Sequence, residues 1–134
     1  MRKEEQDSNV TRIGRQVLSQ QDLEIEVQYK DEIFTLAYPT PLVKTAIEAE
    51  IARRLGGYPR ESYSPEHIQM VEATTYVHNL VILDKSPKWF TSAWNCVDDD
   101  LVQTLFAGYL RFRSQFQERL RQGQFESPLS GKRD

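Results

Sequence analysis

The 134-residue sequence has few of the features that build covalent cross-links or membrane spans. It has one cysteine, Cys96, so an intramolecular disulfide is excluded and a reducing compartment is favoured. No apolar run approaches the roughly 18 residues that a transmembrane helix requires. Residues 1–7 lack the apolar core of a secretory signal. We therefore expect a cytoplasmic protein without membrane contact.

Sequence patterns of known catalytic sites are also missing. Gly56-Gly57 is followed by Tyr58-Pro59, without the lysine and helix start of a phosphate-binding loop, and there is no serine nucleophile elbow. The two histidines, His67 and His78, are about three helical turns apart, too far for one metal site. His78 lies among apolar neighbours and is predicted to be a core histidine. Cys96 is predicted to be a buried structural thiol. We expect no enzyme activity and no cofactor.

Asp98, Asp99 and Asp100 form the most conspicuous polar cluster, because adjacent carboxylates can hold a hard cation. Consecutive residues on a helix point in different directions, however, and no second acidic motif accompanies them. Capping and the positive end of a helix explain these acids better. We predict no metal site.

The charge balance argues against a dedicated nucleic-acid binder. The chain has 17 Lys and Arg against 20 Asp and Glu, a formal net charge of −3, whereas such proteins usually carry an excess of positive charge. Arg111 and Arg113 flank Phe112, which could suggest RNA binding. A solvated helix face is the favoured interpretation.

The first ordered elements are predicted to be two strands. Alternation of apolar and polar residues from Leu23 to Tyr29 is typical of a half-buried strand. A polar turn at residues 30–32 leads to a second strand, Ile33 to Tyr38, rich in β-formers. Because an isolated hairpin is marginal in water, it is expected to lean on helices or on another chain.

Three helices are predicted after the hairpin. Thr40-Pro41 is a cap and first-turn pair for a helix to about Leu55, stopped by the glycines. Ser64-Pro65 opens a second helix to about Leu83, although a strand over Val77–Leu83 is the competing interpretation. A long helix follows Asp98 and ends at Gly123. The apolar side of the first helix is expected to comprise Leu42, Ala46, Ile47, Ala49 and Ile51.

These elements predict an α+β fold that is mostly α, with an N-terminal β-hairpin packed on a bundle of three to four helices. One domain spans 22–122, and 123–134 is a loose tail. Residues 1–21 form a flexible or helical arm, because Val10, Ile13 and Val17 recur at helical spacing. This arm, together with Trp89, Phe90 and Trp94, is the predicted partner-binding surface. The aromatic residues could equally cap the core under a long loop.

Two stretches resemble the tail assembly chaperones of tailed bacteriophages: 29–41, from Tyr29 through the Pro-Thr-Pro step, and 47–57, an acidic and aliphatic helix ending in Gly-Gly. Residues 80–84 and 87–90 resemble that family more loosely. The resemblance implies a non-enzymatic chaperone that binds the tape-measure protein and promotes assembly of the tail tube, in the host cytoplasm. A homo-oligomer stays possible.

The resemblance also implies a testable feature of the gene. Many chaperones of this kind are made in two lengths by a −1 ribosomal frameshift, and Gly131-Lys132 is compatible with a slippery site.

The alternative function is a structural virion protein, such as a small tail, baseplate or connector component. Its hairpin would donate an edge to a neighbouring subunit.

Overall fold

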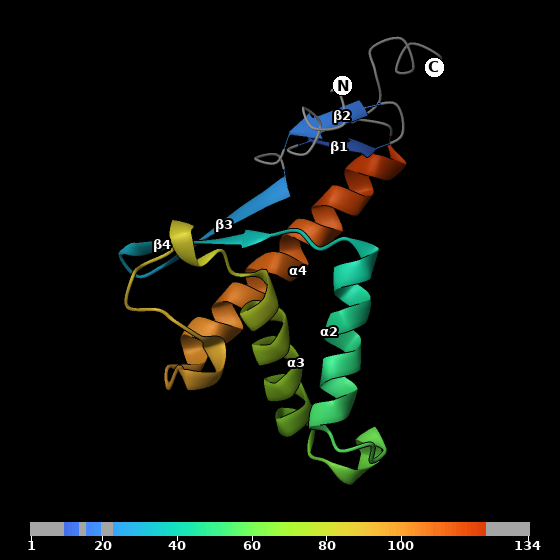
Figure 1. Ribbon diagram of the computed structural model, residues 1–134, viewed down its shortest axis with the longest axis vertical. Helices are drawn as coiled ribbons and strands as arrows, with labels where there is room; N and C mark the ends of the chain where they lie inside the picture. The colour runs from blue at the N-terminus through green and yellow to red at the C-terminus, as the bar shows by residue number, and fades with distance from the viewer. Residues whose placement is uncertain (1–9, 14–15, 20–22, 123–134) are drawn as a thin grey trace, which may run out of the picture. The chain divides into compact units, whose positions relative to one another are not determined.

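The computed structural model describes residues 10–13, 16–19 and 23–122 (Figure 1). The longer elements are β1 (Val10–Ile13), β2 (Gln16–Ser19), β3 (Glu24–Tyr29), β4 (Glu32–Ala37), α2 (Pro41–Arg54), α3 (Pro65–Leu80) and α4 (Asp99–Arg121). Short 3₁₀ turns are η3 (Arg60–Ser62), η4 (Leu83–Lys85) and η5 (Ala93–Asn95). The fold is α+β and mostly helical, with a β-hairpin packed against three helices, as the sequence predicts.

The chain divides into two compact units. The larger, residues 25–110, holds the β3–β4 hairpin, α2, α3 and the first half of α4. The other unit combines residues 1–24 with 111–134, and thus β1, β2 and the second half of α4. No described helix is both long enough and apolar enough to cross a bilayer.

The hairpin forms where the alternating pattern predicts it. Ile25 and Val27 on β3 are buried, while the intervening Glu26 is exposed. On β4, Phe34 and Leu36 are completely buried. The turn includes Lys30, whose φ of 56° places a non-glycine residue in the left-handed region. The apolar face of this hairpin is therefore part of the core.

The edge of β4 is covered by the chain that leaves α3. Val81 forms an antiparallel bridge with Leu36, and the Ile82 amide donates to the carbonyl oxygen of Thr35 at 2.8 Å. The Thr35 amide in turn donates to the Ser86 hydroxyl at 3.2 Å. Of the two structures considered for Val77–Leu83, helix is correct through residue 80, and extended backbone follows. We call residues 81–86 the β4 clasp.

Side-chain caps begin the two shorter helices. The hydroxyl of Thr40 accepts from the Val43 amide at 3.3 Å, and that of Ser64 accepts from the His67 amide at 3.1 Å. A proline follows each cap, where its missing N–H is not needed. Gly56, with φ of +68°, ends the turn after α2 in the left-handed conformation, as predicted.

The predicted apolar side of α2 is only partly correct. Ile47 and Ile51 are buried, but Leu42 is 81 % exposed, and Ala46 and Ala49 are exposed as well. The reason is that α2 packs mainly along α3, so only a narrow stripe is covered.

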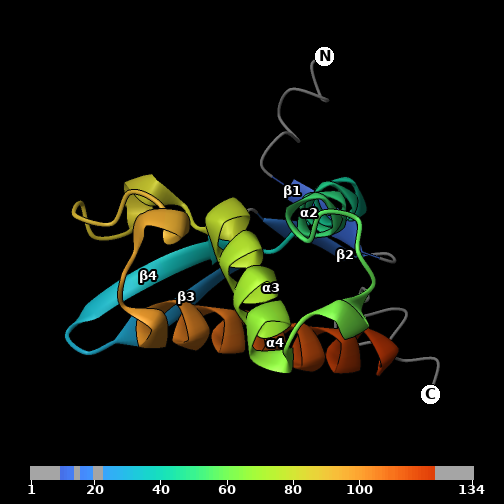
Figure 2. The same cartoon turned by 90° about the horizontal axis from the view of Figure 1, so that it is seen from below.

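Aromatic residues join α3 to α4. The two helices cross in both views (Figures 1 and 2). The ring of Tyr76 lies 5.5 Å from that of Phe106 and 5.5 Å from that of Tyr109, measured between centroids. Tyr38, at the end of the hairpin, has its ring centroid 6.1 Å from that of Tyr109. Such stacked and tilted pairs contribute beyond their buried area.

Gly108 allows α4 to approach β3 closely. A Cβ atom built on Gly108 would lie 2.5 Å from Cγ2 and 3.2 Å from Cγ1 of Val27. These separations are shorter than van der Waals contact, so the packing of α4 against β3 requires a residue without a side chain at this position.

In the smaller unit, β1 and β2 pair as an antiparallel hairpin in which Val10 faces Ser19 and Ile13 faces Gln16. The predicted helix through Val10, Ile13 and Val17 is therefore wrong. Four-residue strands leave too few alternating positions for the strand period to stand out against the helical one. The predicted end of α4 at Gly123 and the loose tail lie outside the described residues.

Candidate functional site

The loop between α3 and α4 presents one exposed indole and anchors it firmly. Trp89 is 57 % exposed. Its Nε1 donates to both carboxylate oxygens of Glu32, at 2.9 and 3.1 Å. Its ring meets that of Phe34 edge to face, with centroids 5.9 Å apart at 82°. An aromatic side chain fixed in this way loses little conformational freedom when a partner covers it.

Phe90 forms the buried half of the same arrangement. It is 4 % exposed, and its ring is perpendicular to those of Phe34 and Trp89, at 5.4 and 6.1 Å. Of the two roles that the sequence leaves open, Phe90 takes the core role. It attaches the loop so that the neighbouring Trp89 stays at the surface.

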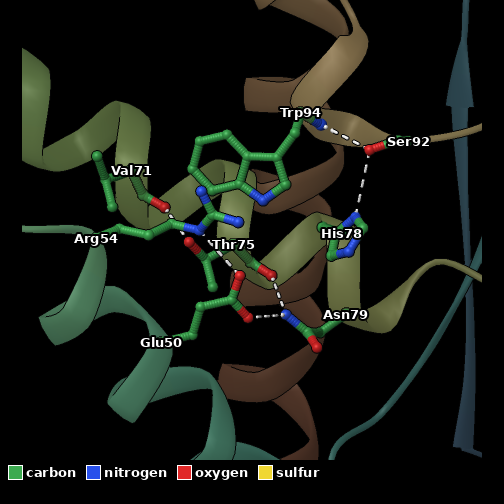
Figure 3. Close-up of polar contacts among 8 residues, drawn as sticks. All are labelled: Glu50, Arg54, Val71, Thr75, His78, Asn79, Ser92 and Trp94. Carbon is green, nitrogen blue, oxygen red and sulfur yellow. Dashed lines mark hydrogen bonds and ion pairs between the residues drawn. The ribbon is translucent and has the colours of Figure 1, made fainter.

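Trp94 lies over the end of α2 rather than beside Trp89 in a common cluster. The guanidinium carbon of Arg54 is 3.9 Å from the centre of the Trp94 ring, a close cation–π contact (Figure 3). This contact links η5 to α2, which is separated from it in sequence by α3. Trp94 is half-buried, so it combines a structural role with some remaining accessibility.

The arginine under Trp94 belongs to a polar network between α2 and α3. Arg54 Nε donates to a carboxylate oxygen of Glu50 at 2.9 Å, and Asn79 Nδ2 donates to the other at 3.3 Å (Figure 3). Asn79 also donates to the carbonyl oxygen of Thr75 at 2.8 Å. Desolvation opposes ionisation of Glu50, but the hydrogen bonds from Arg54 and Asn79 outweigh it and lower the pKa of this carboxyl.

Ser92 stabilises the backbone conformation of the loop at η5. Its hydroxyl accepts from the Trp94 amide at 3.1 Å and lies 3.4 Å from Nδ1 of His78 (Figure 3). His78 is exposed, so the predicted core histidine is wrong. The apolar residues near it in sequence face the other side of α3. Trp94 Nε1 is shielded from solvent and has no hydrogen-bond partner among the described residues.

The remaining candidate residues do not converge on one point. His67 is half-buried and stacks on Tyr63, with ring centroids 5.1 Å apart. Cys96 is half-buried rather than buried, and its thiol lies 3.7 Å from the carbonyl oxygen of Asp98. Among residues 10–13, 16–19 and 23–122, no three His, Cys, Asp or Glu side chains gather as metal ligands.

Asp98 caps α4, as predicted, and also receives a hydrogen bond from the hairpin. Its Oδ1 accepts from the Leu101 amide at 3.2 Å, and its two oxygens lie 3.1 and 2.9 Å from the Tyr29 hydroxyl. The hydrogen bond from Tyr29 lowers the pKa of Asp98. Desolvation, followed by that hydrogen bond, raises the pKa of Tyr29 to about 12. The hydrogen bonds between Tyr29 and Asp98 join β3 to the start of α4, and we call this pair the lock.

The structure therefore does not bring the predicted partner-binding residues together in one exposed surface. Trp89 is exposed, Phe90 is core and Trp94 is half-covered by Arg54. The other three predicted residues lie on β1 and β2, in the smaller unit: Val10, Ile13 and Val17. Sequence reasoning missed the roles of Glu50, Arg54 and Asn79. The i,i+4 spacing of Glu50 and Arg54 was the available signal, but it is common on solvated helices.

Comparisons of the chain with protein-family models, curated proteins and solved structures found no match.

Proposed function

We propose that this protein is a tail assembly chaperone of a tailed bacteriophage, which binds the tape-measure protein in the host cytoplasm and promotes assembly of the tail tube without catalysis. Two things support the proposal. The stretches 29–41 and 47–57 resemble that family. The rigid, exposed Trp89 supplies an anchor of the kind that dominates protein interfaces.

The geometry around Trp89 carries the proposal. One further apolar side chain is exposed on an element next to it: Leu83 in η4 is 47 % exposed, whereas the exposed Ile33 alternates with Glu32 and Phe34 and so lies on the opposite face of β4. β4 and η4 contact each other, and Trp89 is hydrogen-bonded to Glu32 on β4. An apolar helix of a partner could cover the indole and the neighbouring Leu83 side chain.

The direct test is co-expression with overlapping fragments of the tape-measure protein from the same genome. We expect wild-type protein to co-purify with at least one fragment and to suppress its aggregation, measured by turbidity. Trp89→Ala should weaken this binding at least about tenfold, in the range of interface hot spots. The matched control is Tyr58→Ala. Tyr58 is an aromatic residue that is 66 % exposed, but it lies in the segment after α2, outside the hairpin and the loop that hold Trp89.

The two variants separate the possible results. Equal losses for Trp89→Ala and Tyr58→Ala would show that Trp89 is not the anchor. Failure of the wild-type protein to bind any fragment would reject the chaperone function itself.

The alternative, a structural virion component that donates a strand edge, receives less support. The edge of β4 is occupied by the β4 clasp, through the Leu36–Val81 bridge and the hydrogen bond from Ile82 to Thr35. Mass spectrometry of purified particles distinguishes the two functions, because a chaperone should be absent from them and a virion component present.

A further inference from the structure

A groove lies between the N-terminal halves of α3 and α4, both in the larger unit. It encloses about 530 Å³. Its lining comprises Pro65, Glu66, Gln69, Met70, Thr74, Asp99, Val102 and Gln103. Gln69 Nε2 donates to Gln103 Oε1 at 3.1 Å, which joins the two helices beside it. The volume suits one or two side chains of a bound polypeptide.

The groove combines apolar and acidic side chains in a mixed lining. Met70 is 38 % exposed, and Val102 and Thr74 are buried among its lining residues. Glu66 and Asp99 are the only ionisable residues that line it, and both are acidic. Neither has an ion-pair partner within the described part of the chain. No positively charged side chain lines the groove to compete with an incoming cation.

The two acids also lie in the first turns of their helices, where negative charge stabilises the helix. That role explains their position along the sequence. It does not explain the partly exposed Met70 in the same lining, whose apolar surface is left in contact with water. The larger unit as a whole has twelve acidic and seven basic residues, so its field favours a positively charged partner.

We propose that this groove binds a basic amphipathic helix of the partner polypeptide, with an aliphatic side chain against Met70 and Val102 and Lys or Arg beside Glu66 and Asp99. The inference rests on the proposed function for the identity of the partner. It specifies the chemistry that the partner segment must carry. Trp89 would then be one anchor and the groove a second contact that selects for positive charge.

The groove can be tested without the natural partner. Met70 and Met1 are the two methionines of the chain, so methyl-labelled methionine gives two resolvable NMR signals and Met70 reports on the groove directly. The probes are two synthetic helices of about four turns with the same leucine face, one flanked by lysine and the other by glutamate. We expect the lysine peptide to shift the Met70 signal and to bind about three- to tenfold tighter than the glutamate peptide.

A pair of variants with equal net charge separates local from general attraction. Glu66→Gln combined with Asp99→Asn should weaken binding of the lysine peptide about three- to tenfold and reduce its salt dependence. The control combines Glu26→Gln with Asp84→Asn, two exposed acids outside the groove, and should leave affinity nearly unchanged. Equal losses in the two variants, or an unshifted Met70 signal, would overturn the proposal.

The same variants distinguish failure of the groove from failure of the proposed function. If tape-measure fragments bind wild-type protein and the Glu66→Gln, Asp99→Asn variant equally well, the groove proposal is wrong and the chaperone function stands. If the lysine peptide moves the Met70 signal but no fragment binds, the groove is supported and the chaperone function is rejected.

Discussion

Gly108 offers the sharpest test of the packing described above. Replacing it with alanine adds a Cβ whose ideal position is 2.5 Å from Cγ2 and 3.2 Å from Cγ1 of Val27. Valine has little rotational freedom, and Val27 is only 5 % exposed, so its methyl groups cannot simply turn away. Either α4 or β3 must shift, and the shift would disturb the contacts of the hairpin with the helix.

The magnitude follows from two opposing effects. Alanine favours a helix interior over glycine by about 1 kcal/mol. Overpacking a well-filled core costs about 1–3 kcal/mol. We therefore expect Gly108→Ala to lower the free energy of unfolding by up to about 2 kcal/mol in the wild-type background. In a Val27→Ala background the clash is gone, and the same change should stabilise the protein by about 1 kcal/mol.

The assay is a double-mutant cycle measured by denaturant unfolding, followed by circular dichroism. Ala107→Gly, at the exposed neighbouring position on α4, measures the helix-propensity effect separately and should cost about 1 kcal/mol. A coupling energy between positions 27 and 108 above about 1 kcal/mol is expected. If Gly108→Ala stabilises the wild-type and Val27→Ala proteins equally, the close approach of α4 to β3 is not as described.

Three further predictions test the lock, the clasp and the tryptophan. The pKa of Tyr29 is raised from 10.0 to about 12, so its contribution to the free energy of unfolding is present below pH 10 and lost as the pH rises through 12. Tyr29→Phe should therefore make the denaturation midpoint less dependent on pH over that range. The lowered pKa of Asp98 acts oppositely, so Tyr29→Phe should also reduce the loss of stability on acidification. Ser86→Ala leaves the buried Thr35 amide unpaired and should cost about 1–3 kcal/mol, with faster hydrogen exchange at that amide. The free energy of unfolding of Trp94→Phe should stay within about 1 kcal/mol of wild type, because the variant keeps a ring over the guanidinium and removes an unpaired N–H. Trp94→Ala should lower it by about 3 kcal/mol in the same denaturant unfolding experiments. Equal losses in the two variants would contradict this account.

The sequence predicts the larger unit well because its signals are local. Alternation identifies β3, the pairs Thr40-Pro41 and Ser64-Pro65 place the starts of α2 and α3, and Asp98 caps α4 as expected. Each of these signals depends on residues within a few positions of one another, so no knowledge of the tertiary structure is needed.

Features that depend on distant residues were not predictable in the same way. His78 was expected in the core because apolar residues surround it in sequence, yet α3 turns it outward toward Ser92. The contact of Trp94 with Arg54 joins residues 40 positions apart, and nothing local indicates it. Gly108 is an isolated glycine in a helical pattern, which signals a reason for its presence without naming Val27 as that reason.

The β4 clasp determines which hairpin the chain can form. A shift of β4 by one residue against its neighbours would turn Phe34 and Leu36 away from the core, and it would also separate Leu36 from Val81 and Thr35 from Ile82. Alternative registers are therefore penalised twice, once through burial and once through the chain that leaves α3. It follows that the hairpin should acquire its final register only after α3 has folded, so a nascent chain released before residue 86 would still sample several pairings.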